Sequence, residues 1–155
     1  MKHPNPKSEI RNPKSPTGLI RASMLYLFSA STGARIAIDE DIRGQFLGRC
    51  SEKMPQEDFV RGMGTALSPG VKMLVAQMAA TALAGRQGFL GNVGVAALTL
   101  LGAAATVGML GEAVTYQVLN PRTFDPPKAI IVTGNIIFPI IMVLLGAREL
   151  GRERR

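Results

Sequence analysis

Tryptophan is absent from this chain of 155 residues, aromatic residues make up 5% of it, and it contains one cysteine and one histidine. The single cysteine, Cys50, excludes an intramolecular disulfide. The single histidine, His3, lies in a polar N-terminal segment, so neither a bis-histidine haem site nor a zinc site is expected. For the same reason the apolar part of the chain offers no serine–histidine or cysteine–histidine pair for nucleophilic catalysis. We therefore expect a protein that is not an enzyme and has no cofactor or metal.

Formal charge is missing from two long stretches, Phe89–Leu110 with 22 residues and Ala129–Ala147 with 19. A helix rises about 1.5 Å per residue, so each stretch is long enough to cross a hydrocarbon core of about 30 Å. Small residues are frequent in these stretches, as they are where membrane helices pack together. The pattern predicts a small multi-pass integral membrane protein.

Two shorter apolar stretches complete the expected bundle. The first has an uncharged centre of only 13 residues, Ala22–Ala34, and the arginines that flank it, Arg21 and Arg35, extend its reach by snorkelling. The second begins at Pro69, which suits a first helical turn, and the tight turn Gly85–Gly88 connects it to the next stretch as a helical hairpin. We predict an all-α transmembrane bundle of four spans, or three if the first does not cross, at about 19–38, 69–85, 89–110 and 129–147.

The segments outside the spans are polar. Residues 1–17 carry four prolines and a repeated Asn-Pro-Lys-Ser, which predicts a disordered basic tail, and either Met1 or Met24 is the true start. Between the first two spans, Ile42, Phe46 and Leu47, and then Phe59, Met63 and Leu67, recur at helical spacing. We expect one or two amphipathic helices on the membrane surface there, or a solvated loop. Residues 148–155 form a basic tail.

Charge predicts the orientation. The net charge is +7, and the bases cluster beside the apolar stretches at both chain ends rather than forming a stripe interleaved with aromatics, which argues against nucleic acid as a partner. With four spans, both ends and the short turn with Arg86 lie on one side of the membrane. Lys and Arg favour the cytoplasmic side. We expect an inner-membrane protein with both termini cytoplasmic, whose partners are the bilayer and a second copy or another membrane protein.

Two charged residues at the outer ends of spans invite an explanation. Lys72 and Glu112 stand at the same expected depth, so an ion pair between them is predicted. In a structural interpretation this pair fixes helix register. In a functional one, Glu112 is a carboxylate that handles an ion or a proton.

Uncharged polar residues within the spans have the same two interpretations. Pro139 lacks an N–H, which frees the carbonyl of Asn135 and predicts a kink. Asn135 then either forms an interhelical hydrogen bond or contacts a substrate. Gln77 and Asn92 are expected to face each other across the hairpin. Two small-residue rows are expected to pack helices closely, namely Ala76, Ala80 and Ala84, and Ala104 with Gly108.

The run Gly111-Glu112-Ala113-Val114-Thr115-Tyr116-Gln117-Val118-Leu119 resembles a Gly-Glu-Pro-x-Thr-x-x-x-Leu stretch of small uncharacterised multi-pass membrane proteins of bacteria. The likeness covers roughly the last 90 residues, and Ala113 departs from the proline of that pattern. It implies class, topology and bacterial origin but no activity. We expect a structural or accessory role, with a small ion- or proton-coupled transporter or channel subunit as the alternative.

Overall fold

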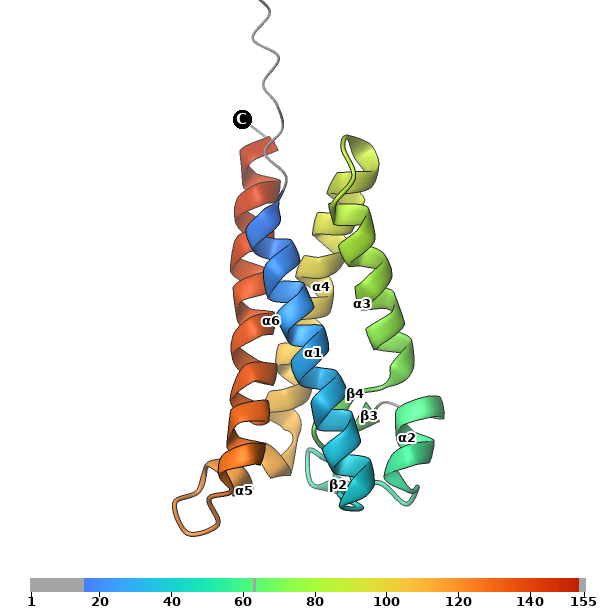
Figure 1. Cartoon of the computed structure of the whole chain (residues 1–155), viewed down its shortest axis with the longest axis vertical. Coiled ribbons are helices and arrows are strands. Elements are labelled where there is room, and N and C mark those ends of the chain that lie inside the picture. Colours follow the sequence, from blue (N-terminus) through green and yellow to red (C-terminus); the bar gives the residue numbers. More distant parts are fainter. Residues whose placement is uncertain (1–15, 63, 154–155) are drawn as a thin grey trace, which may run out of the picture.

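Four long helices run alternately up and down the molecule and form a bundle (Figure 1). The computed structural model describes residues 16–62 and 64–153. The start of α1, the α3–α4 turn and the end of α6 lie at one end of the bundle, and the short elements lie at the other. The long helices are α1 (Thr17–Asp39), α3 (Val71–Ala84), α4 (Phe89–Gly111) and α6 (Pro126–Glu153), and the short ones are α2 (Pro55–Arg61) and α5 (Ala113–Leu119). The prediction of a helical bundle is confirmed.

α6 packs between α1 and α4, and α3 packs against the other side of α4. Glycines allow the backbones to approach: a Cβ on Gly94 would clash with the Ala84 backbone, and one on Gly102 would lie 2.9 Å from the Pro139 carbonyl oxygen. The predicted close packing is thus correct for Ala84, and Ala80 of the same row is also buried, whereas Ala76 is exposed. It is wrong for Ala104 and Gly108, because Ala104 is exposed and a Cβ on Gly108 would meet no atom within 4 Å.

The helix boundaries follow the apolar stretches closely. α6 exceeds its prediction at both ends, because Pro126 and Pro127 are tolerated in a first turn and because the helix continues through residues assigned to the basic tail. α4 and α6 are long and apolar enough to cross a membrane. α1 is long enough but less apolar, and α3, with 14 residues, is shorter than a usual span. The predicted disordered tail lies outside the described residues up to residue 15.

The segment between α1 and α3 departs from the prediction. The segment that contains Ile42, Phe46 and Leu47 does not form a helix. Instead, β1 (Gln45–Phe46) pairs antiparallel with β2 (Arg49–Cys50). Leu47 and Gly48 connect these strands with φ values of 49° and 80°. Positive φ at both central residues is the mark of a two-residue hairpin turn of type I′, which cannot continue a helix. The second expected helix is present only in part: α2 contains Phe59 but ends at Arg61, and Leu67 lies in the hairpin that follows.

A second hairpin follows α2 and lies inside the bundle. β3 (Gly64–Thr65) pairs antiparallel with β4 (Ser68–Pro69). The four residues at its tip, Thr65 to Ser68, are at most 4% exposed. A Cβ on Gly33 of α1 would clash with the Leu67 carbonyl oxygen, so the hairpin touches the α1 backbone. A segment predicted at the membrane surface or in solvent therefore fills the space beside α1 and α6.

Candidate functional site

The buried polar side chains of α1, α3 and α6 hydrogen-bond to one another. The Gln77 amide nitrogen donates to the Ser23 hydroxyl over 2.7 Å, and the hydroxyls of Ser23 and Thr81 are 2.6 Å apart. The same amide nitrogen lies 3.4 Å from the Met142 sulfur. These contacts join three helices, as the structural interpretation of Gln77 requires.

Gln77 does not face Asn92, and that prediction is wrong. Gly94 packs against Ala84, so Asn92 lies beside the end of α3. Gln77 lies seven residues before Ala84, or about 10 Å deeper at about 1.5 Å per residue. Asn92 is half-buried in the first turn of α4. The register of the hairpin therefore separates the two amides.

Asn135 contacts the buried hairpin. Its amide nitrogen donates to the Leu67 carbonyl oxygen over 2.7 Å, and both residues are completely buried. Its side-chain oxygen has no hydrogen-bond partner among the described residues. Pro139, four residues later, lies inside α6, and the helix continues through it without a break. Of the two interpretations of Asn135, the structure contains the interelement hydrogen bond, with a backbone carbonyl of the hairpin as the acceptor.

Lys72 and Glu112 do not form the predicted ion pair. Lys72 is exposed in the first turn of α3. The Glu112 carboxylate instead accepts a hydrogen bond of 2.8 Å from the backbone N–H of Gln45. An exposed ammonium keeps its hydration, whereas immobilising a long side chain in a pair costs entropy, so a rigid backbone donor is the better partner.

Glu112 is the point at which the first hairpin attaches to the bundle. Its extended backbone angles separate α4 from α5, and the residue forms an isolated bridge with Phe46. The N–H of Leu47 donates to the Gly111 carbonyl oxygen over 2.9 Å. Burial raises the pKa of the half-buried Glu112 carboxyl, and the hydrogen bond from Gln45 partly opposes that rise.

An apolar cavity of about 570 Å³ lies beside Glu112, between α3, α4 and the β3–β4 hairpin. Tyr26 of α1 also lines this cavity; the residue is 1% exposed, and its hydroxyl has no hydrogen-bond partner among the described residues. Most of the wall consists of small or apolar residues, including Pro69, Met73, Ala103, Ala104, Ala105, Val107, Gly108 and Met109.

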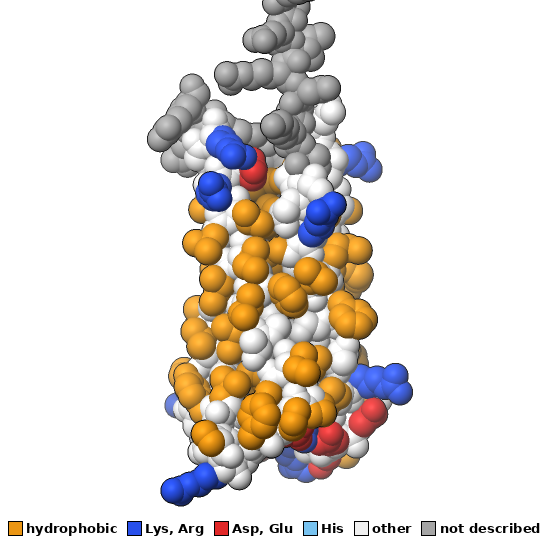
Figure 2. Space-filling model, turned by 60° about the vertical axis from the view of Figure 1, so that its left-hand side comes forward, with side chains coloured by type: hydrophobic (Ala, Val, Ile, Leu, Met, Phe, Trp, Pro, Cys, Tyr) orange, Lys and Arg blue, Asp and Glu red, His pale blue; other side chains and the backbone are white. Residues whose placement is uncertain are grey.

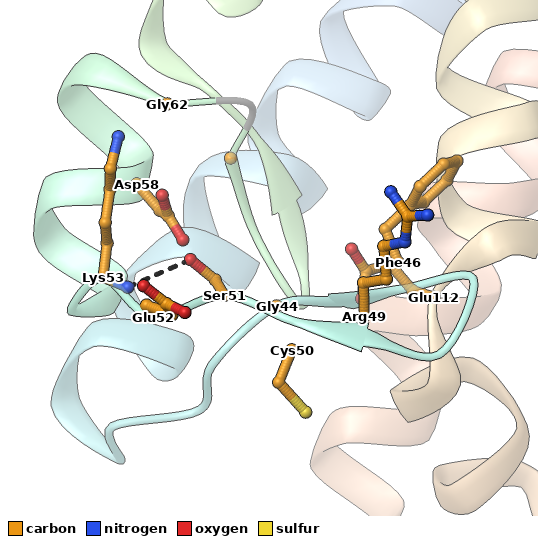
Figure 3. A pocket seen from close by; sticks show the side chains of 11 residues that line it. Gly44, Phe46, Arg49, Cys50, Ser51, Glu52, Lys53, Asp58, Gly62 and Glu112 are labelled. Atoms are coloured by element: carbon orange, nitrogen blue, oxygen red, sulfur yellow. Dashed lines mark hydrogen bonds between the residues drawn. The ribbon is translucent and has the colours of Figure 1, made fainter.

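A second cavity, of about 430 Å³, lies on the other side of Glu112, and several charged residues line it (Figure 3). Its lining includes Arg49, Lys53 and Asp58. Both cavities share Phe46, Gly64 and Glu112 as lining residues. One carboxylate thus lines both a cavity with several charged residues and an apolar cavity, where it is placed to bind a cation or to exchange a proton.

Other chemistry finds less support at this site. Within residues 16–62 and 64–153, no group of three or more histidine, cysteine, aspartate and glutamate side chains is placed to hold a metal ion. Sequence reasoning singled out Glu112 but missed its hydrogen-bond donor Gln45 and the Tyr26 side chain that lines the same cavity. Tyr26 carried a signal, since it places a hydroxyl within the uncharged centre of the first apolar stretch. Gln45 carried none.

Comparison of the chain with protein-family models, with curated proteins and with solved structures finds no match.

Proposed function

We propose that the chain is an integral membrane protein that crosses the inner membrane of a bacterium with α1, α3, α4 and α6. The supporting observation is a belt of large apolar side chains that are exposed on all four helices. About a third of each span-length segment of α4 and α6 is buried inside the bundle, and both helices also carry exposed apolar side chains. Exposed apolar members of the belt include Met24, Leu25, Phe28, Val75, Met78, Leu100, Val107, Ile130, Ile137 and Leu144. A bilayer covers such a belt, whereas exposing so many large apolar side chains to water is energetically unfavourable.

Charged side chains gather at the two ends of the face drawn in Figure 2, and its middle is apolar or uncharged. At the end with the hairpins, the Lys128 ammonium lies 2.6 Å from a Glu40 oxygen and 2.7 Å from an Asp125 oxygen. Arg86 and Arg148 are exposed near the opposite end. This distribution supports both termini in the cytoplasm, because Arg86 lies in the short α3–α4 turn and Arg148 near the end of α6, and the positive-inside rule counts Lys and Arg in short loops and beside span ends.

The shortness of α3 is compatible with a span. Non-helical backbone is tolerated at membrane depth where it is buried in protein. The β3–β4 hairpin, which precedes α3, is such a segment: its tip is buried, and Asn135 satisfies the Leu67 carbonyl. The hairpin and α3 together therefore span more of the bilayer than the 14 residues of α3 do alone.

We propose a structural or accessory role without catalysis, exerted through the β1–β2 hairpin and the apolar cavity that meet at Glu112. Topology is the first test. Compartment-sensitive reporters fused after Cys50 and Asn120 are expected outside, and those after Gln87 and Arg155 inside. Reporters at 50 and 87 on the same side would refute the crossing by α3, and release of the chain from membranes by alkaline carbonate would refute integral insertion.

A small proton- or ion-coupled transporter is the second candidate, favoured by the two cavities that share Glu112. Glu112→Gln removes the charge and keeps the shape. In a proton-coupled uptake or resistance assay, loss of flux at unchanged expression would support transport. Absence of any flux by the wild type, or an unchanged flux in the variant, would leave the accessory role.

A further inference from the structure

The apolar cavity beside α4 has the features of a ligand site. We propose that it binds a lipophilic amine, a molecule with one apolar body and one protonated nitrogen, and that the nitrogen binds the Glu112 carboxylate. The inference goes beyond the membrane role proposed above. A volume of about 570 Å³ lies within the range of about 300–1,000 Å³ that is usual for small-molecule sites.

The wall of α4 is open rather than packed. A Cβ on Gly108 would meet no atom within 4 Å, and Ala103 and Ala104 are exposed although both line the cavity. Val107 is 65% exposed on the same stretch of α4. The cavity therefore opens sideways, at the belt that the bilayer covers in the membrane role proposed above. A molecule dissolved in the bilayer reaches the cavity without passing the β1–β2 hairpin.

The carboxyl group of Glu112 determines which polar group the ligand should carry. Among the described residues that line the cavity, Glu112 is the one carboxylic acid, and no described ion pair involves it. A carboxylate beside an apolar wall is stabilised by a cation that donates hydrogen bonds to it and is destabilised by an anion. A protonated amine meets this requirement.

Tyr26 gives independent evidence that the cavity is made to be occupied. A buried hydroxyl without a partner is costly, and native structures rarely leave one so. Tyr26 lies near the middle of α1, whereas Glu112 lies beyond the end of α4, so the two polar groups stand at different depths of the cavity. An amine bound at Glu112 directs its body toward Tyr26, and a ligand whose body also carries a polar atom would give this hydroxyl a partner.

The test uses the full chain in a neutral detergent and three probes with the same chain: dodecylamine, dodecanol and dodecanoate. Binding is measured by native mass spectrometry. We expect one equivalent of dodecylamine to bind, about tenfold more tightly than either other probe, because only the ammonium forms a charge-assisted hydrogen bond with Glu112. Equal affinity for the three probes, no binding of dodecylamine, or a tightly held two-chain phospholipid that dodecylamine does not displace would overturn the proposal.

Two variants locate the site. Glu112→Gln is expected to weaken dodecylamine binding about tenfold and to leave dodecanol binding unchanged. Gly108→Leu is expected to abolish binding of all three probes by filling the cavity; the helix should tolerate it, because leucine is the better helix former. The matched controls are Glu57→Gln, on exposed α2, and Gly151→Leu, where a Cβ also meets no atom within 4 Å. Unchanged dodecylamine binding in either site variant would overturn the assignment, whatever the topology of the chain proves to be.

Discussion

The Asn135 side-chain amide donates to the Leu67 carbonyl oxygen over 2.7 Å, across a sequence separation of 68 residues and within the buried interior. The bond holds the β3–β4 hairpin against α6, while Gly33 of α1 accommodates the same carbonyl from the other side. The hairpin in turn forms part of the cavity wall through Thr65, Ser68 and Pro69. One hydrogen bond thus connects the middle of the last helix with the shape of the candidate site.

Replacing Asn135 by leucine should destabilise the protein by about 1–2 kcal/mol, because the Leu67 carbonyl then stays buried without a donor. The loss of the unpartnered Asn135 side-chain oxygen offsets part of the cost. Thermal unfolding in detergent, followed by helical circular dichroism, measures the change. Thr133→Val, an exposed position one half-turn earlier on α6, is the control and should unfold like the wild type. Equal stability of the two variants would show that the hairpin does not depend on this bond.

Two glycine-to-alanine changes should act in opposite directions. Gly33→Ala forces a methyl group onto the Leu67 carbonyl and should cost about 1–3 kcal/mol, as overpacking does. Gly108→Ala meets open space and should stabilise α4 by up to about 1 kcal/mol, since alanine is the better helix former. The same unfolding assay compares them. A stabilising Gly33→Ala would mean that the hairpin does not rest on α1.

The pH dependence of stability should change with Glu112. Because the folded-state pKa of this carboxyl is raised, the unfolded chain loses its proton first as the pH increases. Its contribution to stability is thus complete below the unfolded pKa of about 4.3 and is lost as the pH rises through the folded value. Glu112→Gln should remove this loss. Unfolding curves recorded from pH 4 upward would contradict the prediction if wild type and variant declined in parallel.

The single cysteine permits a test of orientation in the native chain. Cys50 is exposed on β2 at the hairpin end. A membrane-impermeant maleimide should therefore label the wild type in intact cells. In a Cys50→Ser background that also carries Gly151→Cys, labelling should require lysis. The reversed pattern would place both termini outside.

The long helices follow from the sequence alone. Phe89–Leu110 and Ala129–Ala147 lack any charge, and Gly85–Gly88 separates α3 from α4, so local composition sufficed to place them. Glu112 was also identifiable, because a carboxylate beside a long apolar stretch is expensive and invites a reason. These are properties of a segment and its immediate neighbours, and they do not depend on how the rest of the chain folds.

Tertiary structure decided which groups meet. Helical spacing suggested a surface helix where the chain folds into the β1–β2 hairpin, because periodicity cannot weigh a type I′ turn at Leu47 and Gly48 against an amphipathic helix. Depth in the bilayer suggested Lys72 as the partner of Glu112, yet the rigid N–H of Gln45 takes that place. A row of small residues says that something approaches closely, but only the packed fold shows that Gly94 meets a helix while Gly108 faces a cavity. Partners far apart in sequence are chosen by competition among many contacts, and that competition is resolved only when the whole chain has packed.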